Sequence, residues 1–191
     1  SYFKVPSTPT DPSEAIETGL RAMQSEPGYD PSTVEYLGHG TTVATNIVIQ
    51  RKGARTGLLT TKGFRDVLEL GRQARPSIYN YRVEKPPVLI PRDRRLEVTE
   101  RIDAQGRVET PLDTASLAIS VAALKDAEVE AVAICFLHSY LRPEHEAAAR
   151  AAVENALPGV YITCSSEILP EFREFERMST TAINATLGPK M

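Results

Sequence analysis

The sequence is poor in the features that mark membrane proteins and nucleic-acid-binding proteins. It has no tryptophan, only two cysteines, and a net charge of −3 over 191 residues. So small an acidic charge gives no electrostatic reason to expect nucleic acid or an anionic membrane as a partner. The longest apolar run, residues 131–137, has seven residues, whereas a membrane-spanning helix needs about 18. We therefore expect neither a membrane span nor a nucleic-acid partner.

The cysteines and the polar first residues favour a reducing compartment. Cys135 and Cys164 both lie in apolar, strand-like segments, so we expect buried free thiols rather than a disulfide. The first 15 residues are polar and proline-rich, unlike a secretory leader. With 41% hydrophobic and 25% charged residues, the composition is that of an ordinary globular protein. We expect a cytoplasmic protein with one substantial core or two small ones.

Alternating helix and strand patterns predict an α/β fold with a mixed or parallel sheet flanked by helices, because this spacing requires crossover connections. The second half alternates in the order helix 114–129, strand 130–137, helix 143–157, strand 159–166 and helix 171–187, with Thr114 capping the first of these helices. The first half predicts a helix capped by Ser13, a strand at 33–38, a helix from Val43 that stops at Gly53, a strand at 54–63, a helix at 64–73, and a hairpin of 97–102 and 107–113 with Asp103 and Gly106 in its turn.

Domain organisation is marked by composition rather than by a clear linker inside the chain. Residues 1–12 carry three prolines and are expected to be a linker or leading segment. Residues 13–113 form a first α/β part and 114–191 a second, and the boundary is soft enough for one domain. Residues 74–96 hold four prolines and no periodicity. A loop of that length in a compact domain is usually functional or covers another surface.

The stretch "HGTTVATN", residues 39–46, turns a short apolar segment into a helix. In a strand–glycine–helix arrangement the first free backbone N–H groups of the helix favour an anion. Hydroxyl side chains add donors, and an imidazole can move a proton. The known phosphate-binding glycine motifs do not occur, so a plain helix start with a structural histidine stays open. The candidates are His39 and Thr42 for catalysis and Gly40, Thr41, Thr45 and Asn46 for binding substrate or phosphate.

Two arginines follow the helix at 64–73. Arg72 and Arg75 stand at its carboxyl end, just before the proline-rich loop. They could simply compensate the helix dipole there. They could also clamp a carboxylate or phosphate, as paired guanidinium groups do. We carry both as candidate binding residues.

Two further polar features are weaker candidates. His138 follows the buried strand at 130–137, and His145 lies seven residues on, beside Glu144 and Glu146. A metal pair is conceivable, but the spacing matches no metal motif, so we expect a hydrogen-bonded His138 and a solvated His145. The hydroxyls of the last helix, 171–187, suggest either close packing or a polar pocket.

Three long blocks together resemble one family. They are "HGTTVATNIVIQRKGARTGLLTTKGFRDVLELGRQARPSIYN", "EVTERIDAQGRVETPLD" and "SSEILPEFREFERMSTTAINATLGP". They are similar to the N-terminal region of the hydantoinase A/oxoprolinase family, which includes N-methylhydantoinases, 5-oxoprolinases, and acetone and acetophenone carboxylase subunits. "VAICFLHSYLRPEHE" fits the same pattern. The resemblance therefore covers nearly all of residues 13–189.

This resemblance implies a lobe of the actin-like/hexokinase-like ATPase superfamily. Family members use ATP, with Mg, to activate a carbonyl or amide oxygen, since phosphorylating it makes a good leaving group. The resemblance also implies a cyclic amide or ketone substrate and a partner subunit of the hydantoinase B type. We assign no metal ligands to this chain. One departure matters: the family's D-x-G-G-T-F-T-D phosphate loop is absent. We expect a portion of a longer subunit, incomplete at the N-terminus and inactive alone.

Three function hypotheses follow. The first is a portion of an ATP-dependent hydrolase that opens a cyclic amide or imide. The second is the corresponding portion of an ATP-dependent ketone carboxylase. The third is a non-catalytic module that docks a partner subunit through the 74–96 loop and the helix bearing Phe172 and Phe175.

Overall fold

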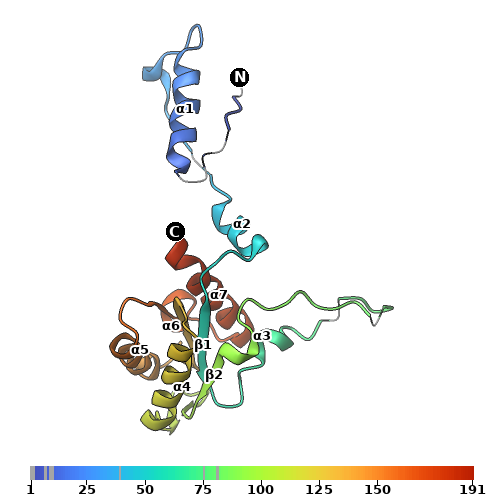
Figure 1. The fold of residues 1–191 in the computed structure, drawn as a ribbon, viewed down its shortest axis with the longest axis vertical. Coiled ribbons are helices and arrows are strands. Elements are labelled where there is room, and N and C mark those ends of the chain that lie inside the picture. Colours follow the sequence, from blue (N-terminus) through green and yellow to red (C-terminus); the bar gives the residue numbers. More distant parts are fainter. Residues whose placement is uncertain (1–2, 7, 9–10, 39, 75, 81) are drawn as a thin grey trace. The chain divides into compact units, whose positions relative to one another are not determined.

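The computed structural model describes residues 3–6, 8, 11–38, 40–74, 76–80 and 82–191 (Figure 1). The chain divides into two compact units, Ser1–Thr41 and Thr42–Met191. Each is described by itself. Among the described residues, no helix is long and apolar enough to cross a membrane.

The first unit is built around helix α1, Pro12–Gln24. Asp11 caps it, because its carboxylate accepts the backbone N–H of Ser13 at 2.9 Å. The prediction of Ser13 as the cap was wrong by two positions, since the Ser13 hydroxyl instead donates to Asp11 at 2.5 Å. After the 3₁₀ turn η1, Pro31–Thr33, the predicted strand at 33–38 is absent from the described residues. Residues 34–38 are exposed and have no neighbouring strand with which to pair.

The second unit contains a four-stranded parallel sheet in the order β2-β1-β5-β6. This confirms the predicted α/β fold and decides for the parallel alternative. Leu59 of β1 lies between Leu96 of β2 and Ile134 of β5 in the register. The strands are β1 Thr56–Thr61, β2 Arg95–Val98, β5 Ala131–Cys135 and β6 Tyr161–Cys164.

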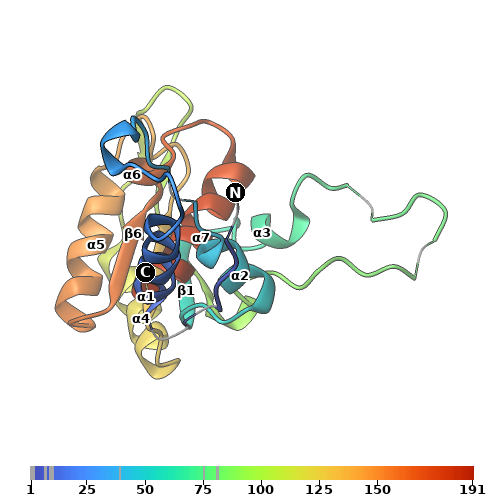
Figure 2. The ribbon, with the colours of Figure 1, turned by 90° about the horizontal axis from the view of Figure 1, so that it is seen from above.

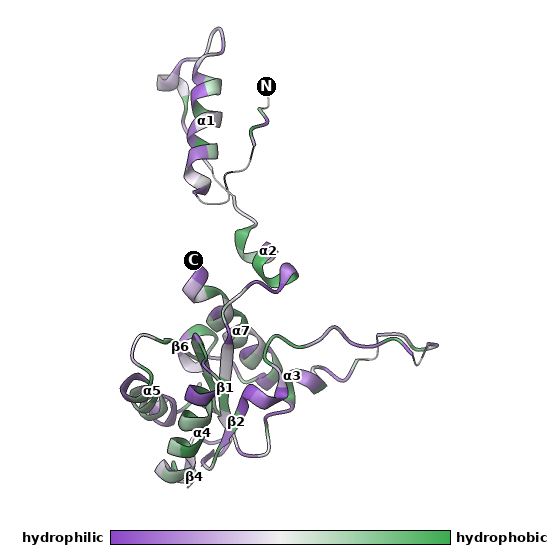
Figure 3. Ribbon diagram, viewed as in Figure 1, coloured by the Kyte–Doolittle hydropathy of each residue, from purple (hydrophilic) through white to green (hydrophobic). Residues whose placement is uncertain are grey.

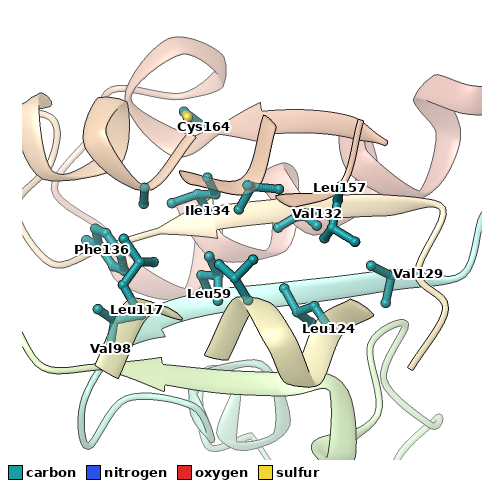
Figure 4. Packing of buried hydrophobic residues seen from close by; sticks show 13 residues of the cluster. Leu59, Val98, Leu117, Leu124, Val129, Val132, Ile134, Phe136, Leu157 and Cys164 are labelled. Atoms are coloured by element: carbon teal, nitrogen blue, oxygen red, sulfur yellow. The ribbon is translucent and has the colours of Figure 1, made fainter. Parts of the chain in front are cut away.

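Helices cover both faces of this sheet (Figure 2). On one face, α4 (Thr114–Asp126) and α5 (Glu144–Ala156) enclose the larger core cluster, which Figure 4 shows around Leu59, Ile134 and Phe136. On the other face, the helices α3 (Val67–Leu70) and α7 (Glu174–Leu187) contribute to a second cluster. Because both faces are covered, β1 and β5 are buried along their whole length. The central strand β5 is also apolar without interruption, as is usual in parallel sheets.

A small hairpin lies between β2 and α4. Its strands are β3, Arg101–Ile102, and β4, Val108–Thr110, with a turn in which Gly106 has φ +76°. The Gly106 N–H donates to the Asp103 carbonyl at 3.0 Å, which confirms the predicted turn. The predicted first strand, 97–102, is split. Its first half belongs to β2 because that segment pairs with β1 in the parallel sheet.

Short elements complete the second unit. They are α2 Val43–Gln50, α6 Ser165–Ile168, η2 Arg92–Arg94 and η3 Gly188–Lys190. Figure 3 shows α2 as largely hydrophobic, although none of its residues is buried. It ends at Arg51, which has φ 54°, rather than at the predicted Gly53. Gly53 lies against Thr186 of α7, and the next N–H, that of Ala54, donates to the Thr186 carbonyl at 2.8 Å.

The proline-rich segment between α3 and β2 extends away from the sheet (Figure 2). We call its residues 74–91 the arm. Its described residues have no helix or strand, as predicted. The predicted loop of 74–96 was too long, because residues 92–94 form the 3₁₀ turn η2 and residues 95–96 begin β2. Ile78 and Tyr79 are 71% and 93% exposed. Arg51 holds the base of the arm, since its guanidinium donates to the carbonyls of Pro87 and Val88.

Two smaller predictions concern α4 and the cysteines. Asp113, not Thr114, caps α4, because its carboxylate accepts the Ala115 N–H at 3.0 Å. Cys135 and Cys164 are buried free thiols, as predicted. Burial raises the pKa of Cys135 to about 11 and that of Cys164 to about 12.

Candidate functional site

The strand order reverses between β1 and β5. From β1 the chain passes through α3 to β2 on one side, whereas from β5 it passes through α5 to β6 on the other side and over the opposite face. In open α/β sheets, ligands bind outside the carboxyl ends of the strands at such a reversal. Here those ends are Thr61 and the residues after Cys135. The topology therefore marks this edge as a candidate site.

A chain of hydrogen bonds crosses that edge from β1 to α5. The Leu137 N–H donates to the Thr61 hydroxyl at 2.9 Å, and Thr61 donates to the Glu100 carboxylate. The other oxygen of Glu100 lies 2.8 Å from His145 Nδ1. An ionised carboxylate can only accept, so His145 Nδ1 is the donor in this contact when Glu100 is ionised.

His145 was therefore wrongly predicted as solvated. Its side chain is only 12% exposed and Glu100 is fully buried behind it. The sequence could not reveal this pair, because the two residues are 45 positions apart and meet only when the segment after β2 folds against the start of α5. His138 has a left-handed backbone, φ 53°, and its Nδ1 lies 3.5 Å from the Tyr140 hydroxyl.

A second buried network lies beside the first, around Glu146. This carboxylate is wholly buried and accepts four hydrogen bonds from the residue after β5 and from the first two residues of α6. The donors are Phe136 N (3.0 Å), Ser165 Oγ (2.6 Å), Ser166 N (2.9 Å) and Ser166 Oγ (2.7 Å). Glu146 thus joins the segment after β5 to the start of α6, which directly follows β6. It serves to shape the edge.

Arg177 of α7 is buried below the same loops. Its Nη2 donates to the Phe136 carbonyl at 2.8 Å, and its guanidinium lies 5.4 Å from the centre of the Tyr140 ring. Thr181 and Thr186 donate to carbonyls four residues earlier in α7, both at 2.7 Å. For these two hydroxyls the structure favours close packing over a polar pocket.

The predicted glycine–threonine corner lies at the junction of the two units. Gly40 and Thr41 belong to the first unit, and both are exposed. Thr42, Thr45 and Asn46 are exposed at the start of α2. His39 lies outside the described residues.

Thr42 precedes α2 but its side chain does not cap the helix. Its hydroxyl instead lies 3.4 Å from Asn46 Nδ2, and its carbonyl accepts the Asn46 N–H at 2.9 Å. The structure thus places Thr42 and Asn46 together as an exposed polar pair. Both still have hydrogen-bonding capacity for a ligand.

Arg72 is placed elsewhere, beside the start of α7. Its Nε donates to Glu176 at 2.8 Å. It lines a groove of about 670 Å³ together with Lys85, Arg92 and Arg95. An ion pair with another helix thus accounts for Arg72, rather than the dipole of α3. Arg75 lies outside the described residues.

The candidate residues do not form one cluster within the second unit. Arg72 contacts Glu176 near the start of α7, whereas the segment after α2 contacts Thr186 near its end. Ten residues of helix separate these two contacts, which corresponds to about 15 Å. Arg72 and the segment after α2 thus contact α7 at separate places.

No metal centre forms within the described ranges, where no three His, Cys, Asp or Glu side chains gather closely enough to hold an ion. The pair of histidines with Glu144 and Glu146 is accordingly not assembled as a metal site. The Glu146 carboxylate already accepts from Ser165, and His145 is hydrogen-bonded to Glu100.

Comparison with known proteins gives consistent matches. The family model for the hydantoinase/oxoprolinase N-terminal region matches residues 1–157. An uncharacterized protein of Methanocaldococcus jannaschii is 42% identical over 97% of this chain and 27% of its own length. The alpha subunit of the caprolactamase of Pseudomonas jessenii is 37% identical over 99% of this chain and 28% of its own length.

Two solved structures share the fold. The crystal structure of the ATP-dependent caprolactamase from Pseudomonas jessenii has a TM-score of 0.83 at 37% identity, over 99% of this chain and 28% of that one. The nucleotide-free acetone carboxylase has a TM-score of 0.81 at 26% identity, over 97% and 29%. This chain thus spans less than a third of the length of these relatives. It belongs to the hydantoinase/oxoprolinase family, whose N-terminal region it matches.

Proposed function

We propose that this chain is part of an ATP-dependent enzyme subunit that opens a cyclic amide or imide by hydrolysis. The observation that carries the proposal is the similarity to the caprolactamase alpha subunit, at 37% identity and a TM-score of 0.83 over 99% of the chain. That relative is described as ATP-dependent. The active unit includes more than this chain, together with a partner subunit of the hydantoinase B type.

In this proposal the exposed corner before α2 contacts the substrate oxyanion or a phosphate. Thr42 and Asn46 supply the hydroxyl and the amide, which lie 3.4 Å apart. Thr45 supports them at the start of α2, while Arg72 acts from a separate part of the second unit. His39, Gly40, Thr41 and Arg75 are kept as proposed site residues of the enzyme. Such donors stabilise charge that develops on a carbonyl oxygen.

ATP, with Mg, would supply the activation by phosphorylating the amide oxygen. The described residues offer no cluster of carboxylates for a metal ion. We therefore derive no step through magnesium from this chain. The chain's own contribution is to bind and orient the substrate or a phosphate group at the corner.

A ketone carboxylase is the second candidate. It is supported by the acetone carboxylase structure, which has nearly the same TM-score, 0.81, but a lower identity of 26%. The higher identity to a cyclic-amide hydrolase favours the first candidate. A docking role for the arm is compatible with either enzyme.

Substitution in the full-length subunit, in complex with its partner, tests the role of the corner. Thr42→Val removes the hydroxyl and keeps the shape, so kcat/KM for ATP-dependent opening of caprolactam should fall by about tenfold or more. Thr180→Val, at an exposed position of α7, is the matched control and should leave kcat/KM unchanged. An unchanged kcat/KM in Thr42→Val would show that the corner does not take part in the reaction.

A further inference from the structure

A cavity of about 350 Å³ lies at the amino end of the sheet, the edge opposite to the strand ends described above. It is formed where the chain leaves α2 and enters β1, next to the end of α7. Its lining residues include three arginines: Arg51, Arg55 and Arg94. They come from the end of α2, the approach to β1 and the turn η2.

These arginines lack carboxylate partners. Among the described residues, none of the three has an acidic oxygen within 4.0 Å, although the other cationic groups near the sheet, such as Arg92 and Arg95, are paired with Asp66 or Glu69. Arg51 donates to main-chain carbonyls of the arm. The cavity therefore holds three guanidinium charges that no side chain neutralises directly.

Glu130, which also lines the cavity, does not supply the missing charge. Its carboxylate accepts the backbone N–H of Arg55 at 2.7 Å and contacts Lys190 Nζ at 3.3 Å. These contacts hold the pKa of Glu130 below its usual value. The Lys190 ammonium already balances the charge of Glu130, so the positive charge of the three arginines is not neutralised by this carboxylate.

Two of the three arginines, Arg55 and Arg94, are also close enough to repel one another. Burial and the nearby charge of Arg55 lower the pKa of Arg94. Cations at a helix carboxyl end can be explained by the dipole, and this accounts for Arg51. It does not account for Arg55 or Arg94, since neither lies in the last turn of an α-helix. Unpaired like charges around a cavity are what an anion would stabilise.

We propose that this cavity is a binding site for a phosphate group. Several guanidinium forks around one space match the three or four oxygens and double charge of phosphate better than a single carboxylate. The volume is at the lower end for small-molecule pockets and admits a phosphorylated small molecule as well as free phosphate. This site is separate from the corner before α2 and does not depend on the reaction proposed above.

Calorimetric titration of the 191-residue chain with inorganic phosphate, in chloride buffer of constant ionic strength, tests the proposal. Saturable binding is expected. Arg55→Gln and Arg94→Gln should each weaken it about tenfold, the loss expected for one charge-assisted contact. Arg142→Gln, an exposed arginine paired with Glu144, makes the same change in net charge and should bind phosphate like the parent.

Two further measurements keep the result decisive. At equal phosphate concentration, phosphate should raise the melting temperature of the parent and of Arg142→Gln clearly more than that of Arg94→Gln, which separates binding from a structural role of the arginine. Titration with ATP tests whether a nucleotide also binds. If the site recognises the phosphate group alone, we expect ATP and inorganic phosphate to bind, and Arg94→Gln to weaken the binding of both to the same extent. No saturable phosphate binding, or equal weakening by Arg142→Gln, would overturn the proposal.

Discussion

At the scale of single residues, buried charges account for the shape of the sheet's carboxyl edge. Glu146 has no exposed surface and accepts from two backbone N–H groups and two hydroxyls. A buried carboxylate is tolerated only when its oxygens are satisfied in this way. Its donors follow two different strands, Phe136 after β5 and the start of α6 after β6, so one side chain fixes both segments.

Glu146→Ala should be strongly destabilising. It leaves the N–H groups of Phe136 and Ser166 buried without an acceptor, and each such loss costs about 1–3 kcal/mol. We expect the free energy of unfolding, measured with urea, to fall by about 3 kcal/mol or more. Glu144→Ala, exposed in the same first turn of α5 and paired with Arg142 at 3.4 Å, should cost less than about 1 kcal/mol. Equal losses would contradict the network.

The thiol of Cys135 should make stability fall at alkaline pH. Burial raises its pKa from 9.0 to about 11, so the folded state keeps the proton while the unfolded state loses it. The stabilisation is complete below pH 9 and is lost as pH rises from 9 towards 11, by about 2 kcal/mol at pH 10.5. Urea unfolding at pH 8 and 10.5 measures it. Cys135→Ala should show a correspondingly smaller pH difference, and an unchanged difference would refute this explanation.

Residue-level expectations succeeded where the signal was local and failed where it was not. The turn at Asp103 and Gly106 could be predicted because adjacent residues make it. The pairing of Glu100 with His145 could not, since nothing near either residue in sequence indicates its partner. Caps were missed by one or two positions because serine, threonine and aspartate are all good caps.

At the scale of elements, α7 contacts segments at both the carboxyl ends and the amino ends of the strands. Its first turns contact Arg72 and the loop that follows β5, and its last turn contacts the segment that enters β1. The close approach at that last turn requires Gly53, where an added Cβ would overlap Thr186. The strands β1, β5 and β6 and the longer helices were predicted within a few residues, because their apolar patterns are regular. The predicted strand at 33–38 is absent from the described residues, and β2 was not predicted as a separate strand.

Gly53→Ala tests that close approach. Overlap with both the side chain and the main chain of Thr186 should lower the free energy of unfolding by about 1–3 kcal/mol, the usual cost of overpacking. Lys52→Ala is the neighbouring control, since Lys52 is exposed, and should change it by less than about 0.5 kcal/mol. A neutral Gly53→Ala would show that α7 can move away without loss.

The arm should be dispensable for folding. Replacing residues 77–84 by a short Gly-Ser linker removes the exposed Ile78 and Tyr79 and leaves β2 and the contacts of Arg51 intact. We expect the melting temperature to change by no more than a few degrees. If the arm docks a partner, the same variant of the full-length subunit should lose co-purification with that partner. Retained co-purification would remove the docking role.

At the scale of the whole molecule, the order of elements carried more information than any one motif. Helix and strand alternation predicted the α/β sheet, and the blocks at residues 39–80, 97–113 and 165–189 indicated the family that the comparisons confirm. Strands from both sides of residue 113 share that sheet. The strand order, and hence the edge where polar networks gather, depends on packing between distant segments and could not be predicted from sequence periods.

The most direct test of the central claim is ADP release by the full-length subunit with its partner, measured against a panel of caprolactam, hydantoin, 5-oxoproline, and acetone with bicarbonate. We predict ADP release that depends on a cyclic amide and matches the amount of ring-opened product. ADP release only with acetone and bicarbonate, or ring opening without ATP, would contradict the assignment to ATP-dependent cyclic-amide hydrolysis.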